Sequence, residues 1–296
     1  MKKMFLFFAL LLLFSACYKT LNEDDILNID AWSPYMNIHN FDYNLQAPHF
    51  SKLVDIGIVR GIRIGKLESG VISSWMFGGR VEILGLFDNE HLRQPNVCEI
   101  FEGYVHDYPY IQYWEIGNEV EYFIDMSPEE YMMIFDKIYK SSRNLNVTLL
   151  SQAPFGNIDG SKILKRMIDV GLNKYSDIIV ALHFYAFDSK AIHCFAGQVH
   201  RLPLSTKVWV TEAGVNKFSQ HISFVNKIYP DIVSSLRAER IYWYVFSECS
   251  EHSLVSNLAP ACTGTVTISP LYLKFIEGKI REQDDSKSIF SRRRRQ

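Results

Sequence analysis

The chain contains little that would direct it to nucleic acid, to a nucleotide or to a metal ion. Its 31 lysines and arginines are balanced by 33 aspartates and glutamates, whereas a nucleic-acid-binding domain usually carries a basic excess. The sequence has no G-x-G-x-x-G, and no C-x-x-C, H-x-H or H-E-x-x-H provides the spacing of a zinc site. We therefore expect no nucleic-acid partner, no cofactor and no metal.

The sequence also lacks an apolar run long enough for a membrane-spanning helix, which needs about 20 residues. Its N-terminal run, Met4 to Phe14, is shorter, follows Lys2 and Lys3, and ends in F-S-A-C at Cys17. These flanks are those of a secretory signal, and F-S-A-C resembles a bacterial lipobox, in which the cysteine is acylated. We expect residues 1–16 to be a lipoprotein signal peptide and 17–30 a tether. The protein would then be exported and lipid-anchored at the bacterial cell envelope; ordinary signal cleavage is the alternative.

The remaining four cysteines form an even set in a compartment that permits disulfides. Cys249 and Cys262 both fall in a predicted loop, so a disulfide between them is plausible. Cys98 and Cys194 fall on predicted helices that lie far apart, and we expect free, buried thiols there. The C-terminal residues 282–296 are polar and end in Arg292 to Arg295, which predicts a disordered basic tail.

Residues 31–281 alternate short β-rich runs with longer amphipathic ones. The expected strands are Pro34–Ile38, Val59–Ile64, Val81–Phe87, Tyr110–Ile116, Val147–Ser151, Ile178–Phe184, Lys207–Thr211 and Arg240–Phe246. Continuous apolar strands indicate burial on both faces, as in a parallel sheet. Eight β–α units over about 250 residues predict a single α/β domain, a (β/α)₈ TIM barrel, rather than a doubly wound fold.

Active sites of such barrels lie at the carboxyl ends of the strands. The polar and aromatic residues expected there are His39, Arg63, Glu68, Asp88, Asn118, Glu119, Gln152, His183, Tyr185, Glu212 and Trp243. Polar groups together with flat rings are typical of a carbohydrate site. Glu119 and Glu212 are 93 residues apart, about three β–α units, which places them across the mouth from one another. Paired carboxylates suit a glycosidase, and a retaining one if they lie about 5–5.5 Å apart.

Five short motifs in this order resemble clan A glycoside hydrolases, the "4/7" superfamily, closest in flavour to family 39 and family 5-like enzymes. They are V-R-G-I-R-I, W-E-I-G-N-E, L-H-F-Y, V-W-V-T-E-A-G and I-Y-W-Y, and they span roughly 37–278. The chain departs from the usual pattern in Gly117, where tryptophan is often found before Asn-Glu, and in the Val-Glu that follows. The departures concern the shape of the sugar subsite rather than the catalytic pair.

The resemblance and the order of the motifs imply the catalytic roles. Glu212 would be the nucleophile, with a pKa kept low by Arg63 or Tyr185, and Glu119 the acid/base, with a raised pKa. Asn118 would bind the sugar's 2-hydroxyl, and Trp243 would form the floor under the sugar. The other expected substrate-binding residues are His39, His183, Arg63 and Tyr185.

Several of these residues have a structural alternative. For Arg63, a purely structural ion pair and a direct role are equally favoured. We expect Glu115 to be a buried structural carboxylate and Glu121 a solvated loop acid. Trp32, Trp75 and Tyr122 could be sugar platforms in loops, but we expect them to be buried aromatics.

The sequence thus predicts an exported, lipid-anchored, monomeric retaining glycoside hydrolase that acts on β-linked oligo- or polysaccharides. A barrel that binds glycan without cleaving it is the main alternative, and intact acids at both positions argue against it. A metal-dependent hydrolase on the same fold is disfavoured, because His39 and His183 lack metal-ligand spacing. The identity of the sugar, the linkage and endo or exo action are not encoded in these motifs.

Overall fold

The computed structural model describes residues 35–38, 43–55, 59–64, 81–185, 188–244, 255–256, 267–274 and 276. The signal peptide, the acylated Cys17, His39, the Cys249–Cys262 pair and the basic tail are predictions that lie outside these residues. Within them, no helix has the length and apolarity needed to cross a membrane.

Eight parallel strands form the central sheet. They are β1 (Tyr35–Ile38), β2 (Gly61–Ile64), β3 (Glu82–Phe87), β4 (Tyr113–Ile116), β5 (Thr148–Leu150), β6 (Ile179–Tyr185), β7 (Lys207–Gly214) and β8 (Ala238–Trp243). A separate antiparallel pair consists of β9 (Val255–Ser256) and β10 (Thr267–Ile268).

The helices lie between and around these strands. The α-helices are α2 (Tyr43–Asp55), α4 (Asn89–Leu92), α5 (Val97–Asp107), α6 (Val120–Phe123), α7 (Pro128–Ser141), α8 (Ile158–Asp169), α9 (Ser189–Val199) and α10 (His221–Leu236). Three short 3₁₀ turns are η3 (Ser142–Asn144), η4 (Leu172–Lys174) and η5 (Phe218–Gln220).

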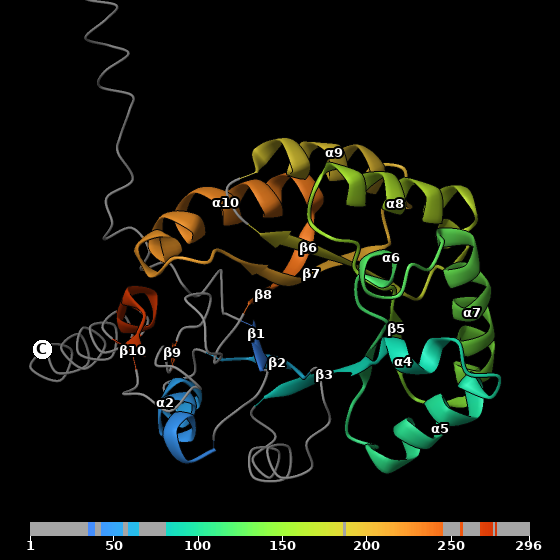
Figure 1. Cartoon of the computed structure of the whole chain (residues 1–296), viewed down its shortest axis with the longest axis horizontal. Coiled ribbons are helices and arrows are strands. Elements are labelled where there is room, and N and C mark those ends of the chain that lie inside the picture. Colours follow the sequence, from blue (N-terminus) through green and yellow to red (C-terminus); the bar gives the residue numbers. More distant parts are fainter. Residues whose placement is uncertain are drawn as a thin grey trace, which may run out of the picture.

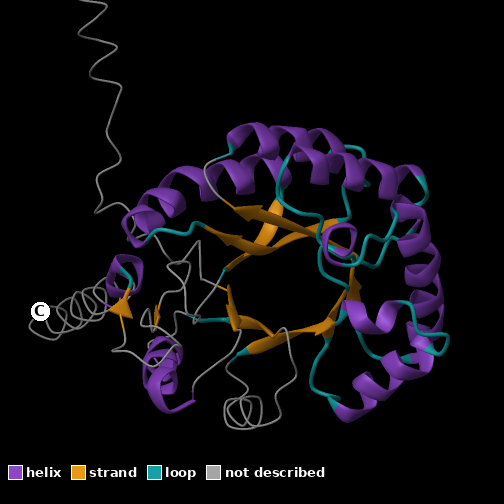
Figure 2. Ribbon diagram, in the orientation of Figure 1, coloured by secondary structure: helices purple, strands orange, loops and turns teal. Residues whose placement is uncertain are grey.

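The sheet closes on itself. Each strand pairs in parallel with the next, and β1 also pairs with β8, with Tyr35 opposite Tyr242. Figures 1 and 2 show the ring of strands with the longer helices outside it. This closed parallel ring confirms the predicted (β/α)₈ barrel.

Side chains alternate between the inside of the barrel and the helical layer, as strand geometry requires. In β4, Tyr113 and Glu115 face inward, whereas Trp114 packs outward against Phe101 of α5. Inward apolar residues from several strands form a small central core, separate from the larger one under the helices. Its buried members are Leu84, Leu150, Ala153, Ile179, Ala181, Trp209 and Tyr242.

Helix α7 illustrates how a sequence signal becomes packing. Ser127 precedes Pro128, and its hydroxyl accepts a hydrogen bond from the Glu130 amide at 3.1 Å, as expected of an N-cap. Tyr131, Ile134, Phe135 and Ile138 follow at helical spacing, and all are fully buried except Ile134, which is half-buried against the core. The core-facing stripe that this spacing predicts is therefore confirmed.

One difference from the predicted elements is in β7, which continues to Gly214 rather than ending at Thr211. Pairing with β6 continues as far as Tyr185 opposite Gly214 and holds the extra residues in the sheet. The short helices α4 and α6 were not predicted, because four residues are too few to show a helical repeat. Both follow strands at the mouth, and α6 directly follows Glu119.

The two cysteines on described helices are free and half-buried. Cys98 lies on α5 and Cys194 on α9, on separate parts of the helical layer. The prediction that these thiols are free is confirmed at both positions, but the prediction that they are buried is wrong, because each is only half-buried.

Candidate active site

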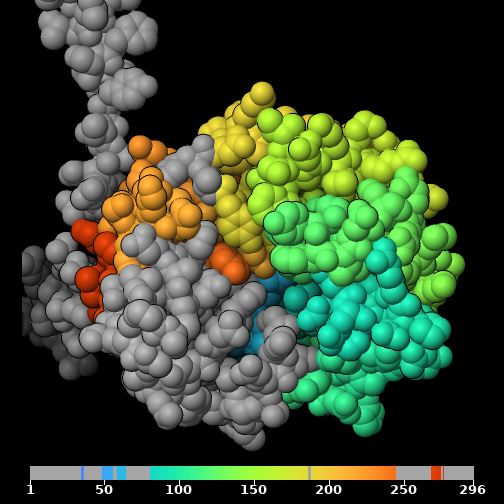
Figure 3. Space-filling model, in the orientation of Figure 1, coloured from blue at the N-terminus to red at the C-terminus, as the bar shows by residue number. Residues whose placement is uncertain are grey.

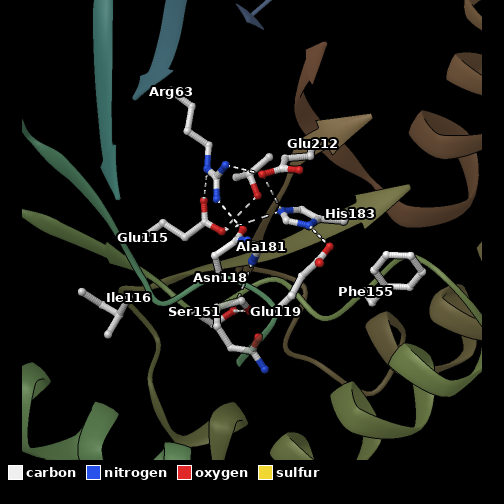
Figure 4. A network of polar contacts seen from close by, with 12 residues as sticks. Arg63, Glu115, Ile116, Asn118, Glu119, Ser151, Phe155, Ala181, His183 and Glu212 are labelled. Carbon is white, nitrogen blue, oxygen red and sulfur yellow. Dashed lines mark hydrogen bonds and ion pairs between the residues drawn. The ribbon is translucent and has the colours of Figure 1, made fainter. Parts of the chain in front are cut away.

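Arg63 is the centre of a buried polar network in the mouth of the barrel. Its side chain on β2 is fully buried, donates from Nε to Glu115 Oε2 at 2.6 Å, and donates from Nη2 to Asn118 Oδ1 at 2.8 Å. Nη1 donates to Glu212 Oε1. Burial alone would lower the pKa of Arg63, but Glu115 and Glu212 outweigh it and raise that pKa above its usual value. Arg63 therefore stays charged and joins β2, β4 and β7, as Figure 4 shows.

A bulge in β7 brings two consecutive side chains into this network. The register with β6 shifts between Leu182, which is opposite Val210, and His183, which is opposite Glu212. Thr211 is the extra residue, and its hydroxyl donates to Glu115 Oε1 at 3.3 Å. In a regular strand, neighbouring side chains would face opposite sides, so the bulge is what lets Thr211 and Glu212 both reach the centre.

A strained turn places Glu119. Gly117 has a φ of 80° and Glu119 a φ of 44°, so both residues occupy the left-handed region. That conformation is uncommon for a glutamate, and residues held in it concentrate at functional sites. The turn is fixed by hydrogen bonds from Glu119 N to Ala153 O at 3.1 Å and from Val120 N to Gln152 Oε1 at 3.2 Å.

Asn89 of α4 holds the backbone of the same turn. Its side chain accepts from Asn118 N at 2.8 Å and donates to Asn118 O at 2.7 Å. Asn89 is not predicted from the sequence, because nothing there distinguishes it from an ordinary loop residue after a strand. Because Asn89 bonds only to the backbone of Asn118, the side chain of Asn118 can accept from Arg63.

His183 lies between the carboxyl groups of Glu119 and Glu212, as Figure 4 shows. Its Nδ1 is 2.7 Å from Glu119 Oε1, and its Nε2 is 3.7 Å from Glu212 Oε1 and 3.9 Å from Glu115 Oε1. Nε2 is buried and has no hydrogen-bond partner among the described residues. One imidazole ring on β6 thus connects the two glutamates that the sequence analysis paired.

The two glutamates differ in their surroundings. Burial raises the pKa of Glu119 to about 7, although the nearby Arg63 opposes the shift. Burial also raises the pKa of Glu212, against the opposing effects of His183 and Arg63. This contradicts the low pKa that the motifs predict for Glu212. The pKa is not low, because the side chain is almost completely buried and desolvation outweighs its donors.

The pKa of His183 is lowered, because burial opposes its charged form and Arg63 adds to this effect. Glu212 and Glu115 act in the opposite direction without compensating. His183 is therefore neutral near pH 7. It carries one ring proton, which lies on either Nδ1 or Nε2.

Three further predicted residues have clear positions. Tyr185 ends β6, and its hydroxyl donates to Glu212 Oε2. Glu115 is fully buried and paired, as predicted for a structural carboxylate. Trp243 is 1% exposed and packs edge-on against His221 and Phe224 of α10. Its ring therefore lies between β8 and the helical layer, and this position does not support the predicted floor under a sugar.

Tyr244, next to Trp243, is an aromatic residue that the sequence analysis missed. Its ring meets the ring of Tyr185 edge to face, with centroids 5.6 Å apart. Because successive side chains of a strand face opposite sides, Tyr242 and Tyr244 face the inside of the barrel and Trp243 faces the helical layer. Of the two neighbouring aromatics in I-Y-W-Y, Tyr244 rather than Trp243 therefore lies beside Tyr185.

Two predictions after Glu119 are wrong. Tyr122 of α6 is 70% exposed rather than buried, and its ring stacks on that of Phe155 with centroids 5.8 Å apart. Glu121 is not a solvated loop acid: its Oε1 accepts from Phe155 N at 3.0 Å, and its Oε2 is buried. Glu121 has a structural role: it is the acceptor for the amide of Phe155, in the loop after β5.

In the part of the chain that the structure describes, no group of three or more His, Cys, Asp or Glu side chains is arranged to hold a metal ion. The network instead has one arginine among three glutamates. Such an arrangement can hold one carboxylate ionised beside another that gains and loses a proton. In Figure 3, the face is hollowed at its centre, where atoms of the blue early strands are visible between the green and orange segments.

Among known proteins, the chain is similar to solved structures alone. No protein-family model matches the chain, and no curated protein matches its sequence. The solved structures that resemble it include an endo-β-1,3-glucanase of glycoside hydrolase family 128, subgroup II, from Sorangium cellulosum. It has a TM-score of 0.58 and 12% identity, over 83% of this chain and 98% of that one.

Two other neighbours of the same family extend this picture. An endo-β-1,3-glucanase from Amycolatopsis mediterranei, crystallised as a mutant with laminaripentaose, has a TM-score of 0.52 and 14% identity, covering 82% and 98% of the two chains. An exo-β-1,3-glucanase from Aureobasidium namibiae has a TM-score of 0.51 and 13% identity, covering 82% and 95%. At this identity the likeness shows the fold: this chain has the TIM barrel found in family 128 glycoside hydrolases. Membership of clan A, and the likeness to families 39 and 5, stay predictions.

Proposed function

We propose that the protein is a retaining glycoside hydrolase that cleaves β-1,3-linked glucans by a two-glutamate double displacement. The observation that carries the proposal is that Glu119 and Glu212 share one buried site but hold different partners. Glu212 is bonded by Arg63 and Tyr185, whereas Glu119 contacts a neutral His183 and has a pKa of about 7. Two carboxyl groups with such different surroundings suit the nucleophile and the acid/base of a glycosidase.

Glu212 is the nucleophile in this proposal. Its two oxygens accept from Arg63 and Tyr185, and these donors favour the ionised carboxylate although burial opposes it. In the first step, Glu212 forms a covalent bond to the anomeric carbon as the bond from that carbon to the leaving oxygen breaks. In the second step, water attacks the same carbon and Glu212 leaves as a carboxylate.

Glu119 supplies and recovers the proton. Nε2 of His183 faces the carboxylates of Glu115 and Glu212, so its most favourable tautomer carries the proton on Nε2. Nδ1 is then an acceptor, and a protonated Glu119 donates to it. Glu119 transfers this proton to the leaving oxygen in the first step and takes one from water in the second.

The proposed substrate class is supported by the structural neighbours and by the aromatic rings of the site. The neighbours are described as β-1,3-glucanases, and some were crystallised with laminari-oligosaccharides. In this chain, half-buried rings of Tyr185, Tyr244 and Phe155 lie beside the two glutamates. Flat aromatic rings beside polar groups suit a chain of pyranose units.

The location of the enzyme is part of the proposal. A glucan polymer is encountered outside the cytoplasm, and the N-terminal F-S-A-C with Cys17 would provide export and a lipid anchor at the cell envelope. We propose that the barrel acts there as a monomer tethered through the segment 17–30. Mass spectrometry of the mature N-terminus would test this directly, because an acylated Cys17 has the added mass of its lipid.

The decisive experiment is hydrolysis of laminari-oligosaccharides and other β-glucans by the wild type, Glu212→Ala and Glu119→Gln. We expect Glu212→Ala to lose at least about 10⁴-fold in kcat and to recover part of it with azide, which replaces the missing nucleophile. Glu99→Ala, an exposed acid on α5, is the matched control. NMR of the first product should show retention of the β-anomer.

Two other outcomes would overturn the proposal. If the wild type binds the oligosaccharides without cleaving them, the protein is a glycan-binding barrel. If EDTA abolishes the activity while Glu212→Ala retains it, a metal carries the reaction. An inverted product would keep the glycosidase but refute the covalent step.

A further inference from the structure

Two large aromatic side chains project into solvent directly after the proposed acid/base. Tyr122 is 70% exposed and Phe123 is 58% exposed, and they are neighbours on α6. Most large apolar side chains in the described part of the chain are buried, so two adjacent exposed rings at the mouth are informative. In Figures 1 and 3, α6 belongs to the green segment that borders the central hollow.

These rings are the outer end of an aromatic row that starts at the reacting groups. Tyr185 donates to Glu212, and its ring lies 5.9 Å from that of Phe155. Phe155 in turn stacks on Tyr122 at 5.8 Å with only 22° between the ring planes. The row therefore runs from the proposed nucleophile, past the side of Glu119, to the surface.

The row is fixed before any ligand binds. Glu121 Oε1 accepts from Phe155 N at 3.0 Å, and Tyr122 N donates to Glu119 O at 2.9 Å. A Cβ added at Gly156 would come within 2.2 Å of His183 O, so the loop that carries Phe155 packs directly on β6. Rings held in this way lose little conformational freedom when they bind a ligand.

We propose that Tyr122 and Phe155 form a subsite for the leaving-group half of the glucan chain, and that Glu121 is the positioning residue that holds it. This inference rests on the proposed function. The acid/base protonates the leaving oxygen, so the departing sugars must extend from the Glu119 side of the cleavage point. Tyr122 is on that side, three residues after Glu119, with most of its ring available to the face of a pyranose.

The subsite has a consequence for substrate length. An enzyme that binds sugars on the leaving-group side gains rate as those sugars are added to the substrate. The enzyme should therefore have a higher kcat/KM for oligosaccharides that extend beyond the cleaved bond than for an aryl β-glycoside of laminaribiose. The leaving group of that glycoside ends beside the acid and does not reach the subsite.

The test is kcat/KM for laminari-oligosaccharides of three to six units and for the aryl glycoside. The variants are Tyr122→Ala and Tyr110→Ala. Tyr110 is the matched control, because it is 41% exposed but precedes β4 at the opposite end of the barrel. We expect Tyr122→Ala to reduce kcat/KM for the longest oligosaccharide about five- to tenfold, the size of one lost aromatic contact. The loss on the aryl glycoside should be smaller, and Tyr110→Ala should match the wild type throughout.

Glu121 is tested by its two variants. Glu121→Gln keeps an acceptor for Phe155 N and should retain the gain with chain length, whereas Glu121→Ala should lose it without a matching loss on the aryl glycoside. The subsite is refuted if the wild type cleaves oligosaccharides and Tyr122→Ala shows the same length dependence.

A binding measurement separates this inference from the proposed function. Calorimetry with laminarihexaose on Glu119→Gln, with and without Tyr122→Ala, does not depend on turnover. If the wild type cleaves nothing but Tyr122→Ala weakens binding, the aromatic rings bind glucan but have no leaving group to hold, and the hydrolase proposal is the one that fails. If Tyr122→Ala leaves that binding unchanged, the subsite proposal fails.

Discussion

The two ends of the barrel each hold an arginine beside a glutamate, but they use them differently. At the mouth, Arg63 is fully buried and bonds to Glu115, Glu212 and Asn118. At the amino end, Arg240 pairs with Glu82 and lies 3.8 Å from the ring centroid of Trp209. Arg240 also lies over Tyr35 and Tyr113.

The difference lies in the charge balance. The amino end has one arginine and one glutamate in its pair, both partly exposed, and aromatic faces supply the remaining contacts of the cation. The mouth has Glu115, Glu119 and Glu212 around one arginine, all of them buried. A buried excess of negative charge is costly for folding, so the mouth is the end of the barrel where the proposed function would explain a charge balance that packing alone does not favour.

The sharpest way to test this comparison is to make the same conservative substitution at both ends. Arg63→Lys should reduce hydrolysis by about 10²–10³-fold, since a lysine cannot serve three partners in the geometry of a guanidinium. Arg240→Lys should keep kcat within about twofold and lower the thermal midpoint by a few degrees. The measurements are kcat on a laminari-oligosaccharide and thermal unfolding by circular dichroism. Equal losses of activity at both positions would contradict the division of roles.

Removing the carboxylates tests the same comparison through stability. Glu115→Ala should cost about 3–5 kcal/mol in the free energy of unfolding, because it breaks a buried ion pair and leaves Nε of Arg63 without its acceptor, although Glu212 still balances the charge of Arg63. Glu82→Ala should cost about 1 kcal/mol or less, because water can replace a partly exposed partner. Urea unfolding of both variants provides the measurement. A Glu115→Ala variant as stable as Glu82→Ala would show that Glu115 does not hold Arg63.

The dependence of activity on pH should be set by the titrating glutamates at the mouth and not by the ion pair at the amino end. Glu119 acts in its protonated form, so activity should fall as the pH rises through about 7, where its raised pKa lies. Glu212 acts in its ionised form, so activity should also fall as the pH is lowered. Because its pKa is raised, this fall should begin at a higher pH than it would for an exposed glutamate. Arg240→Lys should leave both limbs unchanged.

His183→Phe sharpens the assignment of the upper limb. This substitution replaces the imidazole with an apolar ring. It removes the acceptor of the Glu119 proton and so disfavours the protonated carboxyl. The upper limb should move to lower pH by about one unit, the equivalent of one lost hydrogen bond. A shift to higher pH would mean that Nδ1 carries the proton and donates to an ionised Glu119.

Much of this arrangement could be predicted from the sequence because it depends on order and period. Strands that alternate with helices predicted the barrel, and the spacing of Glu119 and Glu212 predicted that they meet at its mouth. His183, Arg63 and Tyr185 were predicted by motif and do lie around these two glutamates.

What could not be predicted depends on local backbone geometry. The bulge that turns Thr211 and Glu212 to the same side leaves no trace in a strand-like run. The left-handed conformation of Glu119 and the clamp by Asn89 are likewise not visible in composition or periodicity. The pKa of Glu212 was mispredicted because its donors were visible in the motifs, whereas its complete desolvation was not.

The smallest expected difference lies at the end of β8, where its last two residues and the one that follows are aromatic and belong to three different layers. Tyr242 belongs to the central core, Trp243 to the core under α10, and Tyr244 meets Tyr185 at the mouth. Tyr244→Ala should raise KM for a laminari-oligosaccharide about three- to tenfold, from the loss of one aromatic contact. Trp243→Phe should instead cost roughly 1–2 kcal/mol of stability, since it removes volume from a packed core.

Both quantities can be obtained from the same two variants, KM from steady-state kinetics and stability from urea unfolding. If Trp243→Phe raised KM more than Tyr244→Ala, the tryptophan would contact the sugar after all, and β8 would have to turn Trp243 toward the mouth when substrate binds. Similar small effects on KM from both variants would instead restrict sugar contact to Tyr185 and the residues after β4 and β5. Either result would show how far around the mouth the substrate extends.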